Sequence, residues 1–273
     1  MAPPRSSAGV HGFELDRAGG FEEIIQGGSV VGIAGFGSLL SERSANSTFK
    51  DVTRFRQGKL RGYRRVFAHV GPNFITLGIS KPPNKVASLS VEKASEDSEI
   101  VVSLFDMAAR DIPAFIEREA EYRFFAVQPV ELDGTVSDQW HIICHASTDK
   151  AFLTNYGQER FDAIYGSLGI RKIWDDGILP CPLYLRHCVL AAENLSPAAH
   201  ASFLDGKPSL PFPAVRAGVL SFPPIATPDT HVSSVKGTYL ADRKTTIRAY
   251  LEQNPTLLSD IDVPQELAER YGG

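Results

Sequence analysis

The sequence has few cysteines, no long apolar run and no large excess of one charge. Its 273 residues include three cysteines, Cys144, Cys181 and Cys188, and no CxxC pair. That number and spacing argue against a disulfide framework and a zinc knuckle, and favour a reducing compartment. No stretch approaches the roughly 18 apolar residues needed to cross a bilayer. The formal net charge of -4 gives no bulk attraction to nucleic acid or anionic membranes. We therefore expect a cytoplasmic protein that has neither nucleic acid nor a membrane as its partner.

Length and composition fit one domain with embellishments. Hydrophobic residues make up 43% of the chain and charged residues 22%, which are ordinary values for a globular protein with a sizeable core. We divide the chain into an N-terminal segment (1–28), a core (29–150) and a helical C-terminal part of the same domain (151–273). The first nine residues are small, contain serine and lack acids, so import into an organelle stays open beside a frayed terminus.

Strand signals dominate the first half and helix signals the second. Residues 30–36 are apolar and end at Gly37-Ser38, which indicates a buried strand running into a loop. Further strands are predicted at 59–70, 74–79, 86–91, 100–105, 122–132 and 139–146. Helices are predicted at 21–26, 112–121, 160–168, 183–193, 197–204 and 243–251. This order favours an α+β fold in which helices flank a small, mostly antiparallel β-sheet or barrel.

A proline-rich stretch interrupts the helical half. Six prolines lie between residues 206 and 237, with little apolar periodicity. We interpret residues 207–235 as a long loop or insertion, which leaves open whether it covers a site.

The turn Gly35-Phe36-Gly37-Ser38-Leu39 is the first candidate site. Small residues after a buried strand let the backbone bend and present successive amides, which can hold a carboxylate or an oxyanion. A glycine turn without a ligand is the alternative. The segment is not GxSxG, GxGxxG or a Walker motif, so serine-hydrolase, dinucleotide and P-loop interpretations have no support here.

Glu119 is the second candidate. Helical spacing places it on one face with three apolar residues, Ile112, Phe115 and Ile116. A carboxylate on an apolar face is desolvated, which raises its pKa toward neutrality and suits proton transfer. The alternative is a core carboxylate that Arg64 or Arg65 neutralises.

The other acidic residues around Glu119 have a simpler interpretation. Glu117 and Glu121 point to other faces of the expected helix and are spaced i, i+4, so we expect solvated surface charges. The pair His187-Cys188 admits thiol chemistry. However, Cys188 falls on an apolar helix face and is better explained as a small core residue.

Three segments together resemble the γ-glutamylcyclotransferase and ChaC-type family. The turn at 35–39 resembles its (Y/F)GSL loop, residues 60–67 resemble its "L-x-G-Y-R-x-x-F" strand, and residues 116–122 resemble its "L-x-x-R-E-x-x-Y" helix end. The resemblance spans roughly residues 31–146. Phe36 stands where tyrosine is usual, which removes a phenol hydrogen bond, and the C-terminal half matches less well.

The resemblance implies an enzyme that converts a γ-glutamyl compound to 5-oxoproline and a released amine. It implies Glu119 as the catalytic acid/base, Gly35, Phe36, Gly37, Ser38 and Leu39 as the substrate-binding loop, and Tyr122 as a pocket residue. An aromatic contact is the alternative role for Tyr122. Glutathione, γ-glutamyl amino acids and γ-glutamylamines are the expected substrate classes, with no metal or organic cofactor.

Two other functional classes stay open. A binding or regulatory module would keep the pocket and recruit a protein partner through the C-terminal helices. A Cys/His hydrolase would instead depend on Cys188.

Overall fold

In the computed structural model, the described residues contain nine strands that form one mixed sheet. The structure describes residues 12–17, 19–25, 27–80, 84–205 and 237–259, together with 261, 263, 265, 267 and 271. The N-terminal residues 1–9 and the proline-rich residues 207–235 lie outside this part of the chain.

The first half of the chain carries all strands but one. Its elements are β1 (Gly12–Leu15), α1 (Gly20–Ile25), β2 (Val30–Gly35), η1 (Ser38–Leu40), α2 (Glu42–Thr48), β3 (Thr53–Arg61), β4 (Tyr63–Val70), α3 (Pro72–Thr76), β5 (Ala87–Lys93), β6 (Glu99–Ala108), η2 (Ala109–Asp111), α4 (Ile112–Arg118), β7 (Arg123–Val127) and β8 (His141–His145). The second half adds α5 (Asp149–Ile164), η3 (Gly166–Leu168), α6 (Pro182–Leu195), α7 (Pro197–Leu204), β9 (Thr238–Leu240) and α8 (Ile247–Gln253).

The strand order along the sheet is β3-β6-β2-β8-β5-β4-β9, with β7 joining β8 to β1. Of the eight strand pairings, five are antiparallel and three, β2 with β8, β5 with β8 and β4 with β9, are parallel. The prediction of an α+β fold with a mostly antiparallel sheet is therefore confirmed. Strand β8 pairs with β2, β5 and β7, so the sheet branches there.

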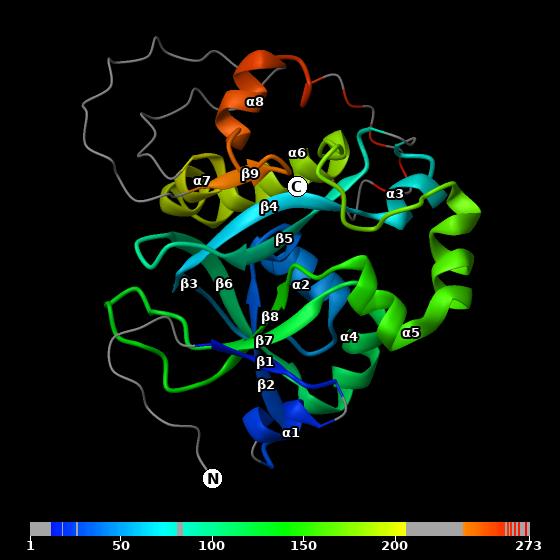
Figure 1. Cartoon of the computed structure of the whole chain (residues 1–273). Helices are drawn as coiled ribbons and strands as arrows, with labels where there is room; N and C mark the ends of the chain where they lie inside the picture. Colours follow the sequence, from blue (N-terminus) through cyan, green and yellow to red (C-terminus); the bar gives the residue numbers. More distant parts are fainter. Residues whose placement is uncertain are drawn as a thin grey trace.

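The helices of the second half pack beside the sheet. Figure 1 shows α6, α7 and α8 together next to β4 and β9. Their apolar residues share one core with sheet residues, because the same cluster contains Leu89 of β5, Phe203 of α7 and Leu251 of α8. No helix in the described ranges has the length and apolar character needed to cross a membrane.

Two of the predicted strands were wrong. The run predicted at 59–70 is two strands, because Gly62 has a φ of +75° and turns the chain between β3 and β4. The strand predicted at 74–79 is instead the short helix α3, which starts with Pro72 in its first turn after the extended Gly71. A Gly-Pro pair can end a strand or begin a helix. Here it begins a helix, in which Phe74 is buried.

The helix predicted at 112–121 is shorter than expected. α4 ends at Arg118, and Glu119 is its C-cap residue with a φ of -102° and a ψ of 36°. We predicted the position of Glu119 from helical spacing, and that spacing does not apply beyond the end of α4. Conversely, the helix predicted from residue 160 begins eleven residues earlier, at Asp149, where the Thr148 side chain accepts from the Ala151 amide.

Candidate functional site

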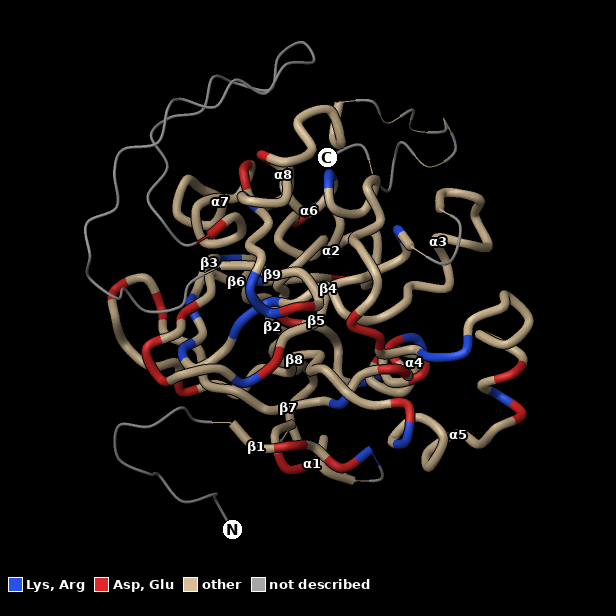
Figure 2. Tube along the Cα trace, turned by 45° about the horizontal axis from the view of Figure 1, so that its top comes forward, with Lys and Arg blue, Asp and Glu red and all other residues tan. Residues whose placement is uncertain are grey.

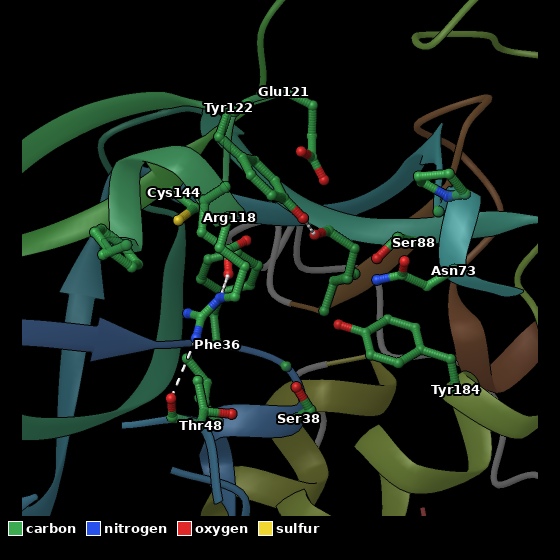
Figure 3. A pocket seen from close by; sticks show the side chains of 18 of the residues that line it. Phe36, Ser38, Thr48, Asn73, Ser88, Arg118, Glu121, Tyr122, Cys144 and Tyr184 are labelled. Carbon is green, nitrogen blue, oxygen red and sulfur yellow. Dashed lines mark hydrogen bonds and ion pairs between the residues drawn. The ribbon is translucent and has the colours of Figure 1, made fainter. Parts of the chain in front are cut away.

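One cavity of about 720 Å³ brings together segments that lie far apart in the sequence. Its walls come from the β2–η1 loop, the α4–β7 junction, β5, α5 and α6. Of the predicted site residues, Phe36, Gly37, Ser38, Leu39, Glu119 and Tyr122 line it. Figure 3 shows Phe36 and Ser38 on the opposite side of this space from Tyr122.

Gly35 is the one predicted loop residue that does not line the cavity. A Cβ atom at this position would lie 2.5 Å from Ser103 Oγ and 2.7 Å from Leu39 Cβ. Glycine is needed because the end of β2 and the following turn approach each other there. Ser103 Oγ fixes the turn by donating a hydrogen bond to the Leu39 carbonyl at 2.6 Å.

A buried arginine holds the other side of the loop. Arg65 Nε donates to the carbonyl oxygen of Phe36 at 2.7 Å, and its guanidinium also bonds the Val101 carbonyl and Ser202. Because the C=O and N–H of a trans peptide point in opposite directions, the Gly37 amide points away from Arg65. Burial of Arg65 lowers the pKa of its guanidinium to about 9.

Glu119 is half-buried rather than in the core. Its amide closes the last turn of α4 on the Phe115 carbonyl, and its carboxylate accepts from Arg118 Nε at 2.7 Å. The Arg118 guanidinium also donates to the Thr48 carbonyl and lies over the Phe49 ring. The partner of Glu119 is therefore its neighbour in sequence and not Arg64 or Arg65.

Glu121 differs most from the sequence prediction. Its side chain is only 17% exposed and lines the cavity, so the prediction of a solvated surface charge was wrong. Burial, followed by the nearby Glu119 charge, raises the pKa of Glu121 to about 8. Helical spacing placed Glu121 in solvent, but the chain leaves the helix two residues earlier and turns this carboxyl inward.

Glu117 behaves as predicted. Its side chain is 65% exposed and pairs with Arg160 of α5. Figure 2 shows acidic and basic positions side by side around α4. Among the carboxylates of this region, Glu117 is thus the solvated one.

Tyr122 combines the two roles that the sequence left open. It lines the cavity, and its ring makes an edge contact with the His69 ring at 4.8 Å. Its hydroxyl lies 2.9 Å from both His69 Nε2 and the Leu89 carbonyl. Burial lowers the pKa of His69 to about 3, so a neutral imidazole donates to Tyr122 while Tyr122 donates to Leu89.

Tyr184 is a cavity residue that the sequence analysis missed. Its hydroxyl lies near the side chains of Ser38, Ser88 and Cys188, against the 35–39 loop. A Cβ atom on Gly37 would come within 3.0 Å of this hydroxyl. Helical spacing puts Tyr184 on the same face of α6 as the buried Cys188, but it does not show which loop that face meets.

The Cys/His pair does not assemble. Burial raises the pKa of the Cys188 thiol to about 12, and His187 Nε2 lies 3.1 Å from Ser44 Oγ. A thiol that keeps its proton is a poor nucleophile. In the described ranges, no group of three histidine, cysteine or acidic side chains is close enough to hold a metal ion.

Comparison with solved structures finds several that match this chain. The fold of this chain is similar to that of γ-glutamyl cyclotransferase. A structure of that name matches 50% of this chain and 88% of its own, with 11% identity and a TM-score of 0.34. An uncharacterised human protein, loc79017, matches the same shares with 12% identity and a TM-score of 0.35. YkqA from Bacillus subtilis matches 63% of this chain and 52% of its own, with 13% identity and a TM-score of 0.38.

Sequence comparison adds no relative. No family model and no curated protein matches the chain. Because the structural identities and TM-scores are low, the evidence for function is the chemistry of the cavity itself.

Proposed function

We propose that this chain is a γ-glutamylcyclotransferase-type enzyme that converts a γ-glutamyl compound to 5-oxoproline and a released amine. The observation that carries the proposal is that one cavity contains both the 36–39 loop and the Glu119 carboxylate. These segments lie about eighty residues apart in sequence, and only the fold brings them together.

The reaction is intramolecular. The α-amine of the γ-glutamyl group attacks the γ-carbonyl carbon, a new C–N bond closes the five-membered ring, and the original amide C–N bond breaks. The attacking ammonium loses two protons as it becomes the amide N–H of the ring, and the leaving nitrogen gains two as it departs as an ammonium. Glu119 takes up these protons one at a time and passes each to the leaving nitrogen, so the reaction balances with no metal or organic cofactor.

The loop binds the anionic part of the substrate in this proposal. The amide of Gly37 points away from Arg65, and Gly37, Ser38 and Leu39 line the cavity. Backbone amides held in this way stabilise a carboxylate or a developing oxyanion. The positive charge of the buried Arg65, which donates to the Phe36 carbonyl, adds an electrostatic attraction for the anionic group of the substrate. Holding the α-carboxylate folds the γ-glutamyl chain toward ring closure.

The test is mass-spectrometric detection of 5-oxoproline after incubation with glutathione, γ-glutamyl dipeptides and γ-glutamyl-lysine. We expect product from at least one substrate, a loss of product with Glu119→Gln, and retained product with Glu14→Gln, which removes an exposed charge outside the cavity. A folded wild-type protein that forms no product from any substrate contradicts the proposal. Binding without turnover supports the alternative of a binding module that recruits a protein partner.

A further inference from the structure

The cavity contains one carboxyl group that its arginines leave without an ion pair. Three glutamates and two arginines line it, namely Glu117, Glu119, Glu121, Arg118 and Arg160. Glu117 pairs with Arg160 and Glu119 with Arg118. In the described part of the chain, the nearest basic group to the Glu121 carboxyl is His69, with 4.0 Å between Nε2 and Oε1. Since burial keeps that imidazole neutral, it does not compensate a charge on Glu121.

The backbone around Glu121 is fixed from behind by Arg17. Its guanidinium donates to the carbonyls of Ala120 and Tyr122, on both sides of Glu121, and to the Tyr156 hydroxyl. Arg17 therefore donates to two backbone carbonyls and one hydroxyl rather than to the Glu121 carboxyl. The Glu121 carboxyl lines the cavity. Figure 3 shows this carboxyl pointing the same way as the Tyr122 hydroxyl, toward the side on which Ser88 and Asn73 lie.

We infer that Glu121 binds the α-ammonium of the γ-glutamyl substrate, an inference that rests on the proposed function. A γ-glutamyl group carries a carboxylate and an ammonium on the same carbon. The 36–39 loop supplies amides for the first, and Glu121 is the half-buried carboxyl with room for the second. Glu119 then remains the group that moves protons, and Glu121 positions the nucleophile for it.

The charge state of Glu121 predicts that the affinity for the substrate depends on pH. Its pKa of about 8 means that the empty site holds a proton on Glu121 at neutral pH. The groups that act on this carboxyl are Glu119, which disfavours its charge, and Arg17 and Arg118, which favour it, with neutral His69 and Tyr122 beside it. Because an ammonium pairs with the ionised form, substrate binding releases that proton, and affinity rises between about pH 6 and pH 8.

The direct test compares two ligands that differ only in charge. Both replace the γ-amide by CH₂–O, so neither can cyclise, and one carries an α-amino group where the other has an α-hydroxyl. We expect wild-type protein to prefer the amino ligand by about 10- to 100-fold, as for a hydrogen bond to a charged group. Glu121→Gln should reduce the preference to below about threefold, and Glu121→Asp should retain part of it. Glu14→Gln should keep it, because Glu14 is exposed, pairs with Arg123 and does not line the cavity.

The outcomes separate this inference from the proposed function. A folded Glu121→Gln variant with the full preference for the amino ligand overturns the inference, whether or not the wild type makes 5-oxoproline. An unchanged KM with a lowered kcat in Glu121→Gln also overturns it, because that result assigns proton transfer to Glu121. A wild type that makes 5-oxoproline but shows no preference between the ligands overturns the inference alone. A wild type that binds neither ligand and forms no 5-oxoproline overturns both.

Discussion

Arg65 donates a hydrogen bond from Nε to the carbonyl oxygen of Phe36 at 2.7 Å, which joins two of the three segments that resemble the cyclotransferase family. The guanidinium is fully buried and reaches β6 through Val101 and α7 through Ser202. In the described ranges it forms no ion pair, and its donors bind the neutral oxygens of Phe36, Val101 and Ser202. The conformation of the 35–39 loop therefore depends on a charge in the core.

Replacing Arg65 by lysine should destabilise the protein. Lysine keeps the charge but cannot reproduce the fork of donors, which leaves the carbonyls of Phe36 and Val101 without a partner. We expect a loss of about 3 kcal/mol in the free energy of unfolding, measured by urea denaturation. Ser202→Ala should cost less, because it removes only one acceptor of Arg65 and the partner of the Val101 amide. Equal stability of Arg65→Lys and wild type would contradict this account.

The two loop glycines should differ in their tolerance of alanine. Gly35→Ala places a methyl group 2.5 Å from Ser103 Oγ and 3.0 Å from the Leu39 carbonyl oxygen, which forces the turn away from β6. We expect destabilisation by about 2 kcal/mol or more, as for overpacking of a core. Gly37→Ala meets the Tyr184 hydroxyl at 3.0 Å, so it should affect binding more than stability. Thermal unfolding and ligand titration of both variants check this difference.

Glu119→Gln should abolish turnover while the fold remains. Removing a general acid/base lowers the rate by about 10²- to 10⁴-fold. The amide side chain can still accept from Arg118, so circular dichroism and the unfolding transition should change little. The matched control is Glu14→Gln, which removes a glutamate that pairs with Arg123 outside the cavity. Equal rates of 5-oxoproline formation in the Glu119 variant and the control would exclude Glu119 as the proton-transfer group.

The pKa of Glu121 predicts a pH-dependent difference in stability. A glutamate has a pKa of about 4.5 when exposed and this one is raised to about 8 in the folded protein. The stabilisation is complete below pH 4.5 and is lost as the pH rises through 8, because the folded state binds the proton more tightly. Relative to Glu121→Gln, which does not titrate, wild type should lose up to ~1.4 kcal/mol per pH unit across this window. A pH-independent difference would contradict the burial of this carboxyl.

Tyr122→Phe should separate packing from hydrogen bonding. The ring contact with His69 is retained, but His69 Nε2 and the Leu89 carbonyl lose their shared partner. We expect a loss of about 1–3 kcal/mol in the free energy of unfolding, because buried polar groups are left unsatisfied. The measurement is chemical denaturation at pH 7. A variant as stable as the wild type would show that water replaces the hydroxyl.

The sequence by itself determined the class of fold and two of the segments that line the cavity. Apolar runs that end at glycine predicted β2 and its turn, and the order of strands before helices predicted the α+β arrangement. The loop and the Arg118–Tyr122 segment were identified from short motifs, since their residue types are set by local backbone needs. Gly35 illustrates the limit of such motifs, because its role is close packing and not contact with the cavity.

Only the tertiary structure decided which charges are buried. Helical spacing placed Glu119 on an apolar face and Glu121 in solvent, but α4 ends at Arg118, so Glu119 pairs with its neighbour and Glu121 turns inward. The end of a helix depends on the elements packed against it, here β7 and Arg17 from the N-terminal part of the chain, and periodicity carries no information about them. Tyr184 and Arg65 reach the loop for the same reason. Burial of a polar side chain is a property of contacts between distant segments, and these exist only in the folded chain.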